Sequence, residues 1–394
     1  MRAACSFANG STTHAGRRGA RYTPPMFFLA LWSACGPVPY PEVGNDPVVP
    51  TDSDSRADVD TPGAPGRDTP APSEDSPLDT PNETPADSPA DSPADSPADT
   101  TGPPAAPLEI GIVSDLNGSY GSTTYATEVH RAVDALLADP PSVVLIPGDM
   151  VAGQQSGLDY AAMWAGFHAA VTDRLTAAGI PVVPSPGNHD ASAYSGYGPE
   201  RTAYANAWSG RLPNLPAVDV TDWPFRHAWR LDDVLIVALD DTKVGPIDTA
   251  QRTWLDGLLA APARGKVVFG HVPLHPFTVG RETEVLADAA LETVMRDGGT
   301  DVFVSGHHHG WYPGWHDGLR VASMPCLGSG SRSLIGTSTT APKALVRLTL
   351  GPQGGIDRLE AYEGTAMNAQ IPRSSLPTQL SYGGVTVVRE DLGP

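Results

Sequence analysis

The sequence predicts a layered α/β domain that begins at Leu108. From there, short β-branched runs alternate with amphipathic stretches of helical period, which is typical of sheets covered by helices rather than of an all-β sandwich. Five of the predicted strands end in Asp, Asn or His side chains. Because ligands bind at the carboxyl ends of strands in open α/β sheets, we expect a functional site at that edge.

Strands and helices alternate strictly in the first half of this domain. β-branched residues mark the strands, and apolar residues three and four apart mark the helices. The expected elements are strands at 108–113, 143–146 and 180–183 and helices at 127–138 and 158–178. Residues 191–224 are rich in Tyr, Trp, Gly and Pro. We expect them to form a long ordered loop with a helix at 201–208, and such loops are commonly functional.

The second half begins with a predicted hairpin, because Asp232-Asp233 separates two apolar runs. Asp248 is a suitable N-cap for the helix that follows. The expected elements are strands at 225–230, 234–239, 266–269, 301–304, 319–323, 344–350 and 356–362 and helices at 249–260 and 284–297. The domain is therefore expected to span residues 108–363, and residues 364–394 form a C-terminal extension with no clear period.

Residues 1–35 have the pattern of an export signal. Four arginines precede the apolar run Met26–Trp32, which is too short to span a bilayer but suits a signal peptide. Ser33-Ala34-Cys35 then resembles a bacterial lipoprotein signal, in which Cys35 becomes the lipidated first residue; a plain secretory signal is the alternative. We expect an exported protein. It would contact the membrane only through a lipid anchor at Cys35, on the cell surface or in the periplasm. Without that anchor it would be secreted.

Residues 36–107 form a low-complexity segment dominated by Asp, Ser, Thr and Pro, with a Pro-Ala-Asp-Ser repeat from Pro85 to Asp99. The segment carries 15 acidic residues against two arginines and almost no large apolar residue. Such a chain cannot offset its ordering entropy by burial. We expect a disordered, extended spacer that holds the domain away from a membrane.

The charge of the chain argues against nucleic-acid binding, and its cysteine content excludes a disulfide within the domain. The chain has 45 acidic residues against 25 basic ones and a formal net charge of −20. Because phosphate neutralisation by Lys and Arg drives most nucleic-acid affinity, we expect no general nucleic-acid binding. Cys326 is the one cysteine after residue 107, so the domain has no internal disulfide and must be stabilised by its own core.

The polar residues at the strand ends are of metal-binding types. They are Asp115 with Asn117, Asp149, Asn188 with His189, His271, and His307 with His309. Each cluster alone would be a common turn or a hydrogen-bonded histidine, but their coincidence at five strand ends indicates a metal site. Carboxylates, amides and imidazoles together suit Mn²⁺, Fe²⁺ or Zn²⁺ rather than Ca²⁺, which prefers oxygen throughout.

Taken in order, these motifs resemble those of the calcineurin-like metallophosphoesterases. The matching blocks are Asp115-Leu116-Asn117, Gly148-Asp149, Gly187-Asn188-His189-Asp190, Gly270-His271 and Gly306-His307-His308-His309. The resemblance covers about residues 108–362. It implies a two-sheet β-sandwich flanked by helices in αββα layers, two divalent metal ions (Mn, Fe or Zn), and a phosphate-ester substrate hydrolysed through a metal-bridging hydroxide.

The resemblance also implies a role for each residue. Asp149 would bridge the two metals, Asp115 and His309 would complete the shell of the first, and Asn188, His271 and His307 would complete that of the second. His189 would protonate the leaving alkoxide, whereas His308 alternates away from the ligands. The expected metal ligands are thus Asp115, Asn117, Asp149, Asn188, His271, His307 and His309, and the expected catalytic residues are His189 and Asp149.

Asn117 departs from the family pattern, which usually has His at this position. A neutral amide would hold the first metal more loosely, unless a residue of the 118–124 loop such as Tyr120 compensates. We expect a dinuclear phosphoric ester hydrolase acting on a mono- or diester. The alternative is a catalytically weakened binding or surface module on the same scaffold. Substrate, metal identities and oligomeric state are left open by the sequence.

Overall fold

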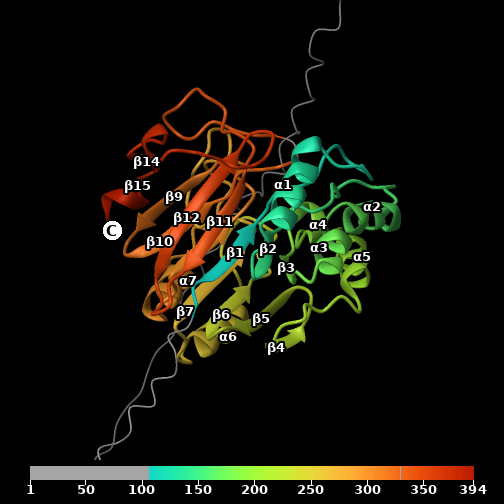
Figure 1. The fold of residues 1–394 in the computed structure, drawn as a ribbon, viewed down its shortest axis with the longest axis horizontal. Coiled ribbons are helices and arrows are strands. Elements are labelled where there is room, and N and C mark those ends of the chain that lie inside the picture. The colour runs from blue at the N-terminus through green and yellow to red at the C-terminus, as the bar shows by residue number, and fades with distance from the viewer. Residues whose placement is uncertain (1–105, 329) are drawn as a thin grey trace, which may run out of the picture. The chain divides into compact units, whose positions relative to one another are not determined.

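A computed structural model describes residues 106–328 and 330–394. It confirms the expected fold class, because two β-sheets pack face to face and helices cover their outer faces (Figure 1). The predicted leader with Cys35 lies outside the described residues, as does the predicted spacer apart from its last two residues. Within the described ranges, every helix is too short or too polar to cross a membrane.

The first sheet has six strands in the order β13-β12-β11-β1-β2-β3. They are β1 Leu108–Ile112, β2 Val143–Pro147, β3 Val182–Ser185, β11 Leu345–Leu350, β12 Ile356–Glu363 and β13 Ala369–Gln370. β1, β2 and β3 run parallel, and β1 also pairs antiparallel with β11. The central strands of this sheet therefore come from both the beginning and the end of the domain.

The second sheet has nine strands in the order β14-β15-β9-β10-β8-β7-β6-β5-β4. They are β4 Ala217–Asp222, β5 Arg226–Leu231, β6 Val234–Ala238, β7 Gly265–Gly270, β8 Val302–Ser305, β9 Tyr312–His316, β10 Leu319–Ser323, β14 Gln379–Tyr382 and β15 Val385–Arg389. β6, β7, β8 and β10 run parallel. The carboxyl ends of β7 and β8 therefore lie at one edge.

The helices form the two outer layers. They are α1 Thr127–Ala138, α2 Tyr160–Phe167, α3 Asp173–Ala177, α4 Asn188–Ala191, α5 Gly198–Trp208, α6 Thr249–Leu259 and α7 Ala289–Asp297, with a π-helix, η1 His168–Thr172, and 3₁₀ turns η2 Arg373–Ser375 and η3 Glu390–Leu392. α1, α2 and α5 bury apolar side chains against the first sheet. α6 and α7 do so against the second sheet.

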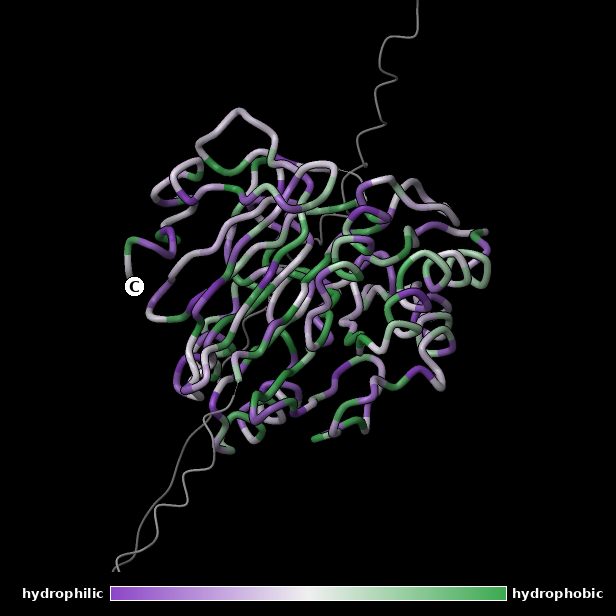
Figure 2. Tube along the Cα trace, viewed as in Figure 1, coloured by the Kyte–Doolittle hydropathy of each residue, from purple (hydrophilic) through white to green (hydrophobic). Residues whose placement is uncertain are grey.

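Strand alternation divides the core into three apolar layers. Leu145 of β2 points inward and packs with Trp229 and Phe269 of the facing sheet. Its neighbours Val144 and Ile146 point outward, as the two-residue period of a strand requires, and pack under the helices. In Figure 2 green, hydrophobic stretches accordingly run through the middle of the domain. This packing holds both sheets rigid beneath the loops at their edge.

Two predicted helices differ from the observed ones. The helix predicted at 158–178 is interrupted by η1, so its hydrogen-bonding period changes midway. The helix predicted at 284–297 begins only at Ala289, because the Asp288 carboxylate accepts the Leu291 N–H (3.0 Å) and caps it. Residues 284–288 are thereby left in the loop that faces the site.

Five strands were absent from the sequence prediction: β4, β9, β13, β14 and β15. β4 is largely exposed and lacks alternation, and β9 contains Pro313 and Gly314, which are unfavourable in strands. β14 and β15 form a hairpin around Gly383 and Gly384, both with positive φ. A Gly-Gly pair between two β-prone runs is a recognised hairpin signal, so this part of the extension was predictable.

Candidate metal centre

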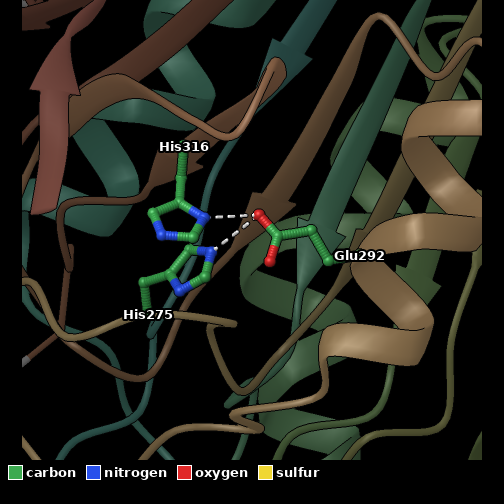
Figure 3. A group of neighbouring side chains, drawn as sticks. All are labelled: His275, Glu292 and His316. Atoms are coloured by element: carbon green, nitrogen blue, oxygen red, sulfur yellow. Dashed lines mark hydrogen bonds and ion pairs between the residues drawn. The ribbon is translucent and has the colours of Figure 1, made fainter. Parts of the chain in front are cut away.

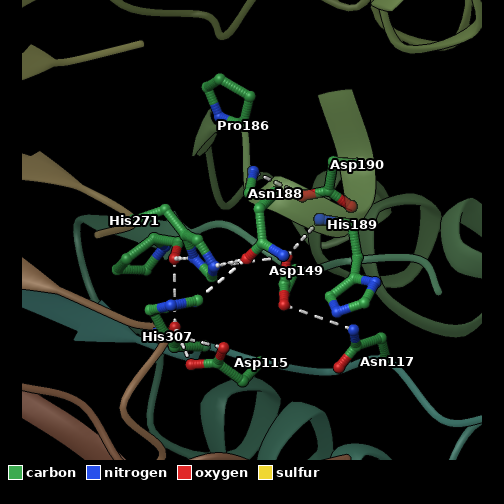
Figure 4. Close-up of polar contacts among 12 residues, drawn as sticks. Asp115, Asn117, Asp149, Pro186, Asn188, His189, Asp190, His271 and His307 are labelled. Atoms are coloured by element: carbon green, nitrogen blue, oxygen red, sulfur yellow. Dashed lines mark hydrogen bonds and ion pairs between the residues drawn. The ribbon is translucent and has the colours of Figure 1, made fainter. Parts of the chain in front are cut away.

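The site lies where the carboxyl ends of parallel strands from both sheets meet. β1, β2, β3, β7 and β8 each lead into a loop that carries one of the expected clusters. Several bonds join the two sheets here. Among them, Ser185 Oγ at the end of β3 donates to the Leu239 carbonyl after β6 (2.9 Å), and the His307 backbone N–H donates to Asp115 Oδ1 (3.2 Å). The structure thus places all seven expected ligands in one region, and Figure 4 labels all of them except His309.

Asp115, Asp149 and His309 form one half of the site. Their ligand atoms lie within 4.8 Å of one another, and His309 Nε2 is 3.1 Å from Asp115 Oδ1. The other ring nitrogen, Nδ1, is 2.8 Å from the Gly330 carbonyl. A carbonyl can only accept, so Nδ1 carries the hydrogen. A neutral ring with its hydrogen on Nδ1 would direct the lone pair of Nε2 at this carboxylate oxygen.

The second half is built around the side-chain oxygen of Asn188. Asn188 Oδ1 lies 2.8 Å from His271 Nε2 and 3.0 Å from His307 Nδ1. His271 donates from Nδ1 to the Pro147 carbonyl (2.9 Å), and His307 Nε2 faces the Glu284 carboxylate (3.0 Å). In the neutral form of either ring, the lone pair of the remaining nitrogen would face an oxygen.

Asp149 lies between the two halves, as Figure 4 shows. Its Oδ1 is 3.3 Å from His271 Nε2 and accepts the His189 backbone N–H (2.9 Å). Its Oδ2 lies 3.4 Å from Asn117 Nδ2. One carboxylate therefore faces groups from both halves, which is the position that a shared ligand would occupy.

Unfavourable backbone geometry is concentrated in these loops. Asp115, Asp149, His307 and His309 all have positive φ, between 52° and 63°. Such conformations are uncommon for non-glycine residues and cluster at functional sites. Gly187 permits a close approach here, because a β-carbon on it would lie 2.1 Å from the Asp149 backbone nitrogen. Only glycine allows the β2 and β3 loops to touch at this point.

Asp190 holds the same two loops together. Its Oδ1 accepts the N–H groups of Met150 and Val151 (2.8 and 2.9 Å), and its Oδ2 accepts that of Gly187 (2.9 Å). The side chain is fully buried. Asp190 therefore acts as a structural clamp between the two loops.

His189 lies at the margin of the centre. Its ring Nδ1 is 3.2 Å from the Gly153 carbonyl, and the Tyr120 ring centroid lies 5.7 Å away. Nδ1 must donate to the carbonyl, so Nε2 is the nitrogen left for proton exchange. His308 points elsewhere, because its Nδ1 accepts the Phe277 N–H (3.1 Å) and its Nε2 donates to the Glu284 carbonyl (3.0 Å).

Three residues of the centre were not anticipated from the sequence. Glu284 and Arg281 both contact the Nε2 face of His307, Arg281 at 3.3 Å, and they pair with each other. Gln154 Oε1 accepts the Asn188 Nδ2–H (3.0 Å) and so fixes the direction of the Asn188 oxygen. None lies in a motif, and their positions depend on loop folding, so the sequence offers no signal for them.

The pKa shifts favour the ionised form of Asp115 and the neutral form of His307. Burial alone would raise the pKa of Asp115, but the adjacent His309 outweighs it and the pKa lies below its usual value. Burial, and then Arg281, lower the pKa of His307 well below its usual value. An ionised carboxylate and a neutral imidazole are the forms that bind metals.

Residues 108–311 match the sequence model of the calcineurin-like phosphoesterase family, which covers more than half of the chain. The chain belongs to this family. Membership establishes a metal-dependent phosphoesterase scaffold in general terms. Among curated proteins, no sequence matches the chain.

Solved structures resemble this chain at low sequence identity. A purple acid phosphatase from yellow lupin (Lupinus luteus) seeds has a TM-score of 0.53 and 14% identity, over 67% of this chain and 53% of that one. A dimetal phosphatase from Danio rerio has a TM-score of 0.43 and 15% identity, over 63% and 96% respectively. The chain thus spans about half the length of the lupin protein, and at these identities the likeness concerns the fold alone.

We predict that Glu284→Gln weakens metal binding about tenfold, because an acidic partner on the far nitrogen of a ligand histidine orients the ring and raises its basicity. Competition with a chelator would measure the dissociation constant. Glu282→Gln is the matched control, since the Glu282 carboxylate accepts the nearby Gly280 N–H instead. If both variants bound the metal equally tightly, Glu284 would not contribute to metal binding.

Proposed function

We propose that this protein hydrolyses a phosphate mono- or diester at the centre described above. The observation that carries the proposal is the orientation of the three imidazoles. His271, His307 and His309 each donate from one ring nitrogen and aim the other at an oxygen of Asp149, Asn188 or Asp115. Where such a ring is neutral, its lone pair and the facing oxygen repel unless a cation lies between them, so the donor set fits metal ions.

Two divalent ions fit the two halves. Asp115 and His309 would hold the first, Asn188, His271 and His307 would hold the second, and Asp149 would be shared. Two close cations repel strongly and need an anion between them, which the central carboxylate would supply. Mixed oxygen and nitrogen donors favour Mn, Fe or Zn. When bound, such ions would neutralise charge on the phosphoryl group and activate a water molecule as the nucleophile.

His189 would complete the reaction as the proton donor. In its charged form the Nδ1–H stays on the Gly153 carbonyl, which holds the ring, and the Nε2–H is given to the leaving alkoxide. The backbone N–H of the same residue donates to Asp149. The imidazole is thereby placed beside the proposed metal bridge.

A second candidate function rests on Asn117. Where the family usually has His, this chain has an amide whose nitrogen faces Asp149, and a weakened first metal site would leave a binding or surface module. The two functions separate in one experiment: metal content per chain, and hydrolysis of bis-(p-nitrophenyl) phosphate and of the monoester with Mn, Fe or Zn added back. Two metals with metal-dependent turnover support the enzyme, and no turnover with any metal supports the module.

We further propose export and tethering through Cys35, on the strength of the leader, the cysteine and the acidic spacer in that order. The mature protein should then fractionate with membranes and begin at a diacylated Cys35. Mass spectrometry of its N-terminal peptide tests this. An unmodified N-terminal peptide from a soluble fraction would instead indicate plain secretion.

Asp149→Asn is expected to abolish turnover, with a loss of at least about a thousandfold, because a neutral amide cannot serve as the shared anion. It keeps one oxygen for the His189 N–H, so the fold should persist. Steady-state assay and metal analysis measure the effect. Asp256→Asn, at an exposed position of α6, is the control and should retain full activity.

His189→Ala is expected to slow turnover by about a hundredfold or more, in line with removal of a general acid, while metal content stays unchanged. The loss should be smaller with substrates whose leaving group needs no proton, such as p-nitrophenol esters. Exposed His130→Ala controls for loss of an imidazole. If His189→Ala emptied the centre of metal, the residue would be a ligand rather than the proton donor.

A further inference from the structure

A second cluster of metal-binding side chains lies outside the candidate metal centre. His275 follows β7, Glu292 lies on α7 and His316 ends β9. Their ligand atoms lie within 4.8 Å of one another. Figure 3 shows both rings directed at one carboxylate oxygen of Glu292. The cluster shares no residue with the centre formed by Asp115, Asp149 and the other loops.

The distances between donor atoms in the cluster are close to the distances between the ligands of a bound metal ion. His275 Nε2 lies 3.2 Å from Glu292 Oε1, and His316 Nδ1 lies 2.6 Å from the same atom. Two ligands of a tetrahedral zinc ion are about 3.3 Å apart, given metal–ligand distances of about 2.0–2.1 Å. The first contact already has this length, and the second reaches it by a small rotation of His316.

Burial and charge also favour a cation. His275 and Glu292 side chains are each 8% exposed and His316 is 17% exposed. Glutamate is rarely this buried unless it is paired, and here both partners are imidazoles. The partly open side of His316 gives a path from solvent.

We propose that His275, Glu292 and His316 bind one zinc-class divalent ion at a site separate from the phosphoesterase centre. Two imidazoles and one carboxylate are a donor set that zinc uses with a fourth position left to water. Mg²⁺ and Ca²⁺ prefer oxygen donors throughout, so this donor set favours zinc over them.

This ion would tie together the segment that contacts the candidate metal centre. The chain between His275 and Glu292 carries Arg281 and Glu284, which contact His307. Closing a loop at its two ends lowers the conformational entropy of the unfolded chain. The ion would thus stabilise this loop and join α7 to the end of β9, without contributing a group to catalysis.

The test measures zinc on the full chain. Wild type, Glu292→Gln and His130→Gln are dialysed against Zn²⁺ and their metal content is measured. Glu292→Gln should hold one zinc fewer per chain than the other two. Zinc at roughly a hundred times its Kd should raise Tm by about 5 °C more in wild type than in Glu292→Gln. Hydrolysis of bis-(p-nitrophenyl) phosphate should be retained in both variants.

The same comparison in an Asp149→Asn background separates the two sites. Adding Glu292→Gln should still remove one zinc, and visible absorption of bound Co²⁺ should fall accordingly. This readout needs no turnover, so failure of the proposed hydrolase would leave it intact. If Glu292→Gln does not fold, His316→Gln replaces it, because that imidazole is more exposed. Equal zinc content with and without the substitution, or a change only in the pH dependence of Tm, would overturn the proposal.

Discussion

The site depends on one close contact between two loops. The turn after β2 and the turn after β3 touch at Gly187 and Asp149, where no side chain larger than hydrogen fits on Gly187. Asp190 fixes this contact by accepting three backbone N–H groups from both loops. Asp149 and Asn188 consequently face the histidines that arrive from the opposite sheet. Because the two sheets are packed rigidly, the donor atoms on these loops are held in fixed positions.

The histidines are oriented by groups behind them as much as by the centre itself. Carbonyl oxygens of Pro147 and Gly330 hold His271 and His309, and the Glu284 carboxylate holds His307. Each partner occupies one nitrogen and leaves the other directed inward. Three imidazoles oriented in this way can bind a cation with little reorganisation. Hydrogen bonds to the far nitrogen of a ligand histidine commonly strengthen metal binding in this manner.

The central residues were predictable because the relevant signals are local. Parallel strands end at one edge, so motifs directly after strands, such as Gly148-Asp149 and Gly306-His307, meet in space. Glu284 could not be predicted, because the helical pattern of 284–297 places it on a helix, whereas the Asp288 cap leaves it in a loop. β9 was missed for a similar reason, since pairing with β10 overrides the poor strand preference of Pro313 and Gly314.

The pairing of β1 with β11 also bears on how the chain acquires its structure. The family match ends at residue 311, yet β11 lies between β1 and β12, with Leu108 opposite Leu350. The matched region therefore lacks a strand that pairs with β1 in the folded domain. During synthesis, the first strand stays without its antiparallel neighbour until residues 345–350 have left the ribosome. This high contact order makes late, slow assembly the expected route to the native state.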